Sequence, residues 1–249
     1  MGSQPAGQES RSAGPRPGPS VGGMAHTDAP HTDAPRIDTP RIDTPRIDAV
    51  TLEVADLTTA RTFYDTAFDL GDRLDLRESD APTSGFRGYH LSVVASRPAD
   101  VRALFDGAVD AGATVLRPVA KSLWGTGGVV QAPDGAIWKV ATSAKKDTRP
   151  AERRIDEVVL LLGAADVGAS KAFYAGHGLR VGKSFGSYVD FAMGDSPIGF
   201  GLYKRRALAK DAGVPPEGSG SHRIVLRGGL GEVTDPDGFA WEPSRAARG

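Results

Sequence analysis

The sequence predicts an α+β protein that contains two consecutive copies of one strand–helix unit. The first copy, from Arg46 to Tyr64, reads R-I-D-A-V-T-L-E-V-A-D-L-T-T-A-R-T-F-Y, and the second, from Arg154 to Tyr174, reads R-I-D-E-V-V-L-L-L-G-A-A-D-V-G-A-S-K-A-F-Y. In each copy an aliphatic run typical of a strand precedes an Asp and then apolar residues at helical spacing. A P-D-G turn closes each copy, at 133–135 and at 236–238. The copies lie about one domain length apart, which predicts two consecutive domains.

Composition excludes several classes of function. The chain has 249 residues, a formal net charge of -1 and 39% hydrophobic residues, so it can bury real cores but gives no electrostatic reason to bind nucleic acid or an anionic membrane surface. It has no cysteine, which leaves His, Asp and Glu as the only plausible metal ligands. Because no apolar run approaches the ~20 residues of a membrane helix, we expect a soluble, cytoplasmic protein.

The predicted domain organisation follows from changes in composition. Residues 1–45 form a Pro-rich tail with a five-residue period such as H-T-D-A-P, and a proline in every period prevents both helix and sheet. A metal-binding tract through His26 and His31 is the alternative for this segment. The charged stretch 144–153 lacks an apolar pattern and predicts a linker. It separates a first domain, 46–143, from a second domain, 154–244, which a basic tail, 245–249, follows.

Local patterns predict the elements of the first copy. Asp56 is a good helix N-cap, and the apolar residues that follow it define one buried helical stripe. Pro98 is placed to start a second helix and Gly112 to end it. The stripe of the first helix comprises Ala60, Phe63, Tyr64, Ala67 and Phe68. The expected strands are 47–54, 74–77, 88–96, 114–119, 128–132 and 137–141.

The second copy is predicted in the same way. A strand at 155–162 leads to a helix at 167–175 and to strands at 188–193 and 198–203. The polar stretch 204–220 favours a short helix followed by a loop. His222 is expected on a strand, 221–227, and the last strand is 239–243.

These elements together resemble the vicinal oxygen chelate superfamily, which includes glyoxalase I, extradiol dioxygenases and bleomycin-resistance proteins. The similarity covers residues 46–243 and rests mainly on the two F-Y helices, the two P-D-G turns and the closing W-E. It implies domains that each pair two βαβββ modules around a cupped mixed β-sheet. Both copies are trimmed, the first in its front half and the second by a missing helix. We therefore expect the two domains to pack on each other, in a monomer or a homodimer.

The resemblance also implies where a metal ion would bind. In the first domain the family's ligand positions fall on Ala49, His90 and Lys139, and an ammonium group excludes a divalent cation there. In the second domain they fall on Glu157, His222 and Glu242, which could hold one Zn²⁺, Ni²⁺, Fe²⁺ or Mn²⁺ ion. Glu242 would then act as the catalytic, proton-moving carboxylate. The alternative is that these carboxylates pair with nearby arginines.

Ligand-binding residues are expected inside the cup. His90 is one candidate, and the others are the aromatic residues Phe86, Trp124, Tyr188, Phe191 and Tyr203. Each of these also suits a core position, as do Trp138 and Trp241, which we assign to core packing. Two functions remain open. One is a small-molecule-binding protein whose ligand lies in a cupped sheet, and the other is a divalent-metal-dependent lyase of the glyoxalase type with its site in the second domain.

Overall fold

A computed structural model describes residues 45–244 of the chain. The predicted tail, with His26 and His31, and the last five residues therefore lie outside the described residues, apart from Pro45. The first half contains β1 (Ile47–Val54), α1 (Leu57–Ala67), β2 (Leu74–Glu78), β3 (Thr83–Gly85), β4 (Tyr89–Val94), α2 (Pro98–Asp110), β5 (Thr114–Ser122), β6 (Gly125–Gln131) and β7 (Ile137–Thr142). The second contains β8 (Glu157–Ala164), α3 (Val167–Gly176), β9 (Val181–Phe185), β10 (Tyr188–Phe191), β11 (Ile198–Lys204), α4 (Arg205–Ala212), β12 (Gly218–Gly220), β13 (Ile224–Gly228), β14 (Val233–Thr234) and β15 (Ala240–Pro243).

Most of the strands form two cupped mixed sheets, and each of these two sheets takes strands from both halves of the sequence. The larger has eight strands in the order β5-β6-β7-β4-β8-β11-β10-β9, and the smaller has five in the order β14-β15-β13-β1-β2. Strands β3 and β12 pair antiparallel in a separate two-stranded sheet. Antiparallel pairing of β4 with β8 joins the halves in the first sheet, and antiparallel pairing of β1 with β13 joins them in the second. The fold is α+β with trimmed strand–helix modules, as predicted.

The segment predicted as a linker is held against the helices of the first half. The backbone N–H of Glu152 donates to Asp100 on α2, and the Arg153 guanidinium donates to the carbonyls of Thr66 and Ala67 at the end of α1. Residues 45–244 all belong to one compact unit. The domain boundary at 144–153 accordingly stays a prediction about the sequence repeat.

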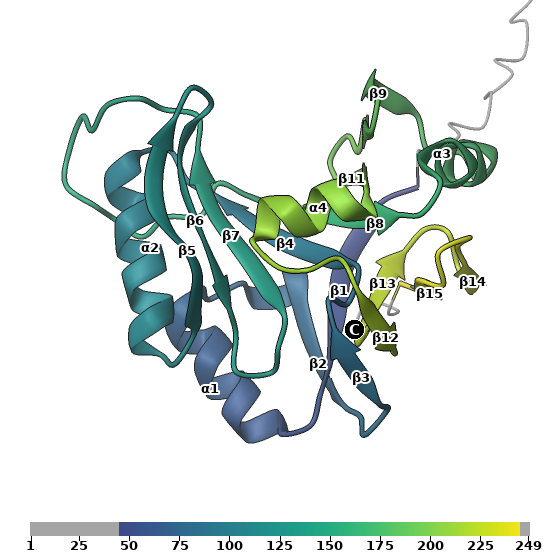
Figure 1. Cartoon of the computed structure of the whole chain (residues 1–249), viewed down its shortest axis with the longest axis horizontal. Helices are drawn as coiled ribbons and strands as arrows, with labels where there is room; N and C mark the ends of the chain where they lie inside the picture. Colours follow the sequence, from purple (N-terminus) through teal and green to yellow (C-terminus); the bar gives the residue numbers. More distant parts are fainter. Residues whose placement is uncertain (1–44, 245–249) are drawn as a thin grey trace, which may run out of the picture. The chain divides into compact units, whose positions relative to one another are not determined.

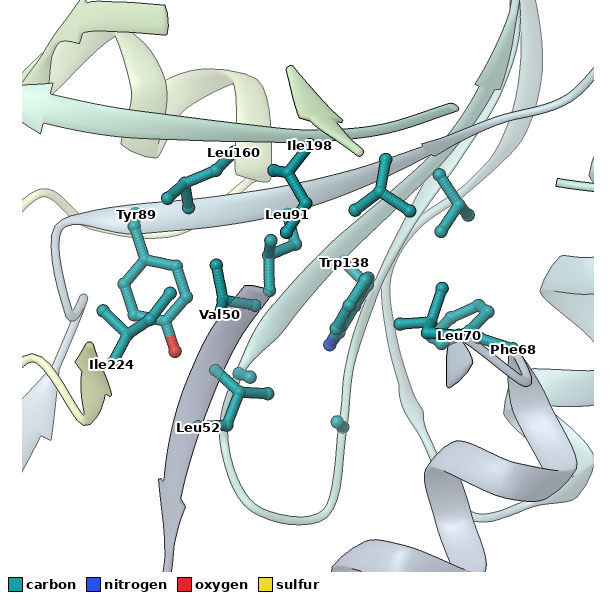
Figure 2. Packing of buried hydrophobic residues seen from close by; sticks show 14 of the residues in the cluster. Val50, Leu52, Phe68, Leu70, Tyr89, Leu91, Trp138, Leu160, Ile198 and Ile224 are labelled. Carbon is teal, nitrogen blue, oxygen red and sulfur yellow. The ribbon is translucent and has the colours of Figure 1, made fainter. Parts of the chain in front are cut away.

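The main hydrophobic core lies between the two sheets (Figure 2). Val50 and Leu52 project into it from β1, and Tyr89 and Leu91 meet them from β4. Leu160 of β8 joins the same cluster. The two sheets and the helices α1, α2 and α3 thus share one core, and the opposite faces of the sheets are left to other contacts.

The two F-Y helices attach to this core through a repeated hydrogen-bond pattern. In the first half the Tyr64 hydroxyl lies 3.1 Å from the Asp134 carboxylate, and the Trp138 indole N–H donates to that hydroxyl across 3.3 Å. In the second half the Tyr174 hydroxyl donates to Asp235 across 2.7 Å and accepts from Trp241 across 3.3 Å. The predicted core positions of Trp138 and Trp241 are confirmed, because both are almost fully buried.

Two strand predictions are corrected by the structure. His222 is not on a strand, because Arg223 takes a left-handed backbone with a φ of 56° and β13 begins only at Ile224. The edge strand β9 was not predicted, since all five of its residues are exposed and show no alternation. No helix within residues 45–244 is long and apolar enough to cross a membrane.

Candidate ligand-binding site

The face of the eight-stranded sheet that points away from the core gathers polar side chains from several strands. Successive side chains alternate between the faces of a strand, so the residues next to Tyr89 point away from the core. His90 lies on this outer face opposite Leu161 of β8, and Ser92 lies beside Lys139 of β7. We call this concave surface the eight-stranded cup and define it by His90, Ser92, Lys139, Leu161 and Tyr203.

Helix α4 covers the middle of the cup, in front of β4, β8 and β11 (Figure 1). Its buried side chains are Leu208, Ala209 and Ala212. They pack in a second hydrophobic cluster that is separate from the main core and includes Phe86 and Ile137. The short helix expected in the stretch 204–220 is present as α4, and its apolar side closes the cup.

A charged group lies under the helix. Asp211 of α4 accepts hydrogen bonds from the Lys139 ammonium at 2.7 and 3.0 Å, and one of its oxygens lies 3.4 Å from Nε2 of His90. His90 is completely buried, and its Nδ1 lies 3.5 Å from the Ser92 hydroxyl. Burial raises the pKa of the Asp211 carboxyl, but the contacts with His90 and Lys139 outweigh burial, so this pKa lies well below its usual value.

A cavity of about 270 Å³ opens beside the end of α4. Phe86, Ile137, Val214 and Pro215 contribute apolar surface to it, and Gln131 and Glu217 contribute polar groups. Ile137 and Lys139 are two residues apart on β7, so they share a face of the strand. The cavity therefore adjoins the Lys139–Asp211 pair along β7. Its apolar side, at Ile137, lies next to the charged groups of this pair.

The predicted ligand-binding residues divide into two sets. His90, Phe86 and Tyr203 all lie in or against the cup beneath α4, and Tyr188 extends this set because its ring is 5.7 Å from that of Tyr203. Burial, followed by the charges of Asp190 and Glu157, raises the pKa of the Tyr188 hydroxyl.

The remaining two predicted residues lie elsewhere. Phe191 is in the main core, stacked on Phe200 at 5.3 Å, because it lies three residues after Tyr188 and so faces the other way. Trp124 lies between β5 and β6 and is 86% exposed.

Sequence reasoning missed Asp211 and assigned Lys139 only as a position that excludes metal. The two residues are 72 positions apart, and no local pattern links them. Only the route of the chain after β11, which returns α4 across the sheet, brings them together.

The predicted metal ligands do not converge. Glu157 begins β8 in the eight-stranded sheet, whereas Glu242 lies on β15 in the five-stranded sheet. Nδ1 of His222 lies 2.6 Å from the Arg87 carbonyl oxygen and Nε2 lies 3.0 Å from that of Asp237, so neither nitrogen is turned toward a carboxylate pair. No group of three or more His, Asp or Glu side chains in residues 45–244 is placed to hold a metal ion. These residues do not fit the metal that the resemblance implied.

Glu242 instead belongs to an ion-pair network on the outer face of the five-stranded sheet. Its two oxygens accept from Arg77 at 2.7 Å and from Arg227 at 2.8 Å. Arg77 also pairs with Glu53 at 2.8 Å, and Arg227 donates to Thr51 across 2.8 Å. The pairing of these carboxylates with arginine, which the sequence left open as the alternative, accounts for Glu242.

Two cupped sheets assembled from strand–helix modules define the structural class of this protein. A model of the Glyoxalase/Bleomycin resistance protein/Dioxygenase superfamily matches residues 3–140, which is more than half of the 249-residue chain. The protein belongs to this superfamily, and the resemblance read from its motifs is confirmed.

Solved structures agree on the fold. Two crystal structures of glyoxalase I variants from Zea mays superpose on this chain with TM-scores of 0.52 and 0.53, and each is 15% identical to it in sequence. The match covers 80% of this chain and 92% or 93% of the maize chains. Similarity at this level of identity shows the fold alone. No curated protein matches the sequence.

Proposed function

We propose that the protein binds a small, mainly apolar organic molecule in the cavity beside the end of α4, next to the eight-stranded cup. The observation that carries this proposal is the cavity of about 270 Å³ beside Phe86 and Ile137, which adjoins the polar group formed by the buried His90 and the partly exposed Lys139 and Asp211. Small-molecule sites commonly combine apolar walls with a few fixed polar groups in this way. Membership of a superfamily that includes bleomycin-resistance proteins is consistent with such a role.

The alternative of a metal-dependent lyase is not favoured. It requires Glu157, His222 and Glu242 around one ion, and both nitrogens of His222 face backbone carbonyls. Without the metal, the catalytic role of Glu242 loses its basis, because that carboxylate is bound by Arg77 and Arg227.

A cavity-filling substitution tests the proposal. Phenylacetamide, a neutral aromatic compound, should bind the wild-type protein in saturation-transfer NMR and in thermal-shift titrations. Val214→Trp should remove this binding because the indole fills the cavity. Val181→Trp, which places the same side chain on the exposed edge strand β9, is the matched control and should bind as the wild type does. Equal binding by Val214→Trp and wild type would overturn the proposal, as would a wild type that binds neither phenylacetamide nor its carboxylate analogue phenylacetate.

A further inference from the structure

The polar group under α4 takes its donors from the sheet and its acceptor from the helix that lies over the sheet. Lys139 and His90 extend from β7 and β4 inside the eight-stranded sheet, whereas the carboxylate that contacts both of them, Asp211, comes from a short helix laid over that sheet. An ammonium group and an imidazole that both face one carboxylate can bind any other carboxylate that reaches the same place between them. Asp211 therefore occupies a place that a ligand could take.

Asp211 satisfies the two donors unequally. It lies 2.7 Å from Nζ of Lys139 but 3.4 Å from Nε2 of His90, a long distance for a hydrogen bond. Nε2 is buried and has no hydrogen-bond partner among the described residues. A buried polar atom without a partner costs free energy. A carboxylate that is free of the helix backbone could approach both residues.

Helix α4 has few constraints of its own. It has eight residues and no side-chain N-cap, and it ends at Gly213 in a left-handed conformation with a φ of 83°. A helix this short is unstable in isolation, so only its contacts hold it. Those contacts are the buried side chains of Leu208, Ala209 and Ala212, the ion pair of Asp211, and several hydrogen bonds. Arg117 donates to the Lys210 carbonyl, and Arg205 donates to the Pro216 and Phe86 carbonyls.

We propose that the ligand is an apolar monocarboxylate whose carboxylate replaces that of Asp211 between Lys139 and His90 and displaces α4 as a lid. This inference rests on the proposed binding function. The apolar part of the ligand lies along Phe86 and Ile137 in the adjoining cavity. Glu217 lines that cavity and is exposed, so its charge disfavours a second anionic group and directs the single carboxylate inward.

Two isosteric compounds separate this inference from the proposed function. Isothermal titration of wild-type protein should show phenylacetate binding at least about tenfold more tightly than phenylacetamide, the ratio expected for one charge-assisted hydrogen bond. If both bind equally, the anion-exchange inference fails and the binding function stands. If neither binds, the binding function itself fails, and this inference fails with it.

Two variants should change the ratio of phenylacetate affinity to phenylacetamide affinity in opposite directions. Asp211→Asn removes the competing charge and should strengthen phenylacetate binding about fivefold to tenfold without changing phenylacetamide binding. Lys139→Met should make the two affinities equal. Lys210→Met removes a lysine charge from the exposed side of α4 and should leave the ratio unchanged. An unchanged ratio in Asp211→Asn contradicts the inference even if Lys139→Met does not fold.

Displacement of the lid has its own readout. Amide hydrogen exchange of residues 205–212 should become at least about tenfold faster when phenylacetate saturates the protein, while exchange in α2 stays unchanged. Unchanged or slower exchange in α4 would show that the helix stays in place, and would refute displacement.

Discussion

Each half of this protein depends on one tyrosine that links a helix to a turn and to a strand. Tyr64 of α1 donates to Asp134 of the P-D-G turn and accepts from Trp138 on β7. Burial raises the pKa of Asp134, and a hydroxyl donor partly offsets that cost. These contacts explain physically why F-Y, P-D-G and Trp occur together in both copies of the sequence.

Removing this hydroxyl should destabilise the protein. Tyr64→Phe leaves the buried indole N–H of Trp138 without its acceptor and Asp134 without one donor, so we expect a loss of about 1–3 kcal/mol in the free energy of unfolding. Urea unfolding followed by circular dichroism measures this change. Tyr188→Phe, at a half-buried position on β10, is the control and should change stability by less than about 0.5 kcal/mol. Equal effects of the two variants would contradict the role assigned to Tyr64.

Individual site residues were harder to predict than core residues. The helical stripe that begins at Ala60 is buried as the apolar spacing predicted. His222 was expected on the strand 221–227, but Arg223 takes a left-handed backbone, so β13 begins only after it, at Ile224. Alternation identifies a buried face and carries no information about a single unusual φ.

At the scale of elements, local signals located the helices well. Asp56 accepts from the backbone N–H groups of Thr58 and Thr59 as an N-cap, and Pro98 is the first residue of α2. Gly112 takes a φ of 107° just past the end of α2. The position of α4 on the cup was not predictable, because its partners Lys139 and Phe86 are distant in sequence.

The attachment of α4 should weaken in acid. The pKa of Asp211 is lower in the folded protein than in the unfolded chain, so the ionised carboxylate stabilises the fold. This stabilisation is complete above about pH 5. It is lost as the pH falls through the ordinary carboxyl range toward the pKa of Asp211 in the folded protein. Wild type should therefore lose more stability than Asp211→Asn between about pH 7 and about pH 3. Urea unfolding across this range tests the prediction.

A matched variant controls for general acid sensitivity. Asp106→Asn removes an exposed carboxylate from α2 and should keep the pH dependence of the wild type. If the stability difference between wild type and Asp211→Asn does not depend on pH, the contact of Asp211 with Lys139 and His90 contributes nothing.

At the scale of the whole molecule, the sequence repeat and the sheets follow different divisions. The repeat divides the chain into a first and a second half, whereas each sheet combines strands from both halves through the β4–β8 and β1–β13 pairs. Two similar sequences can pair within a copy or between copies and leave the same apolar pattern. The repeat therefore predicted the modules and the class of fold, and it could not predict which module pairs with which.

Neither half should fold alone as a monomer. Residues 46–146 would expose the edges of β1 and β4 that pair with β13 and β8 in the whole protein. We expect this fragment to lack a cooperative unfolding transition, and co-expression with residues 147–244 to restore one. Calorimetry and gel filtration of each fragment and of the mixture provide the measurement. A monomeric, cooperatively folded fragment 46–146 would refute this prediction.

The β1–β13 pair has a consequence for the order in which a ribosome could build this fold. During synthesis β4 gains its partner β8 as soon as the second half begins to emerge, so the eight-stranded sheet can assemble first. Strand β1, the first strand of the described chain, waits for β13 near the opposite end and keeps an open edge until then. Contacts this distant in sequence slow folding. The N-terminal strand is thus made first and completed last, and in that interval the nascent chain is most exposed to aggregation.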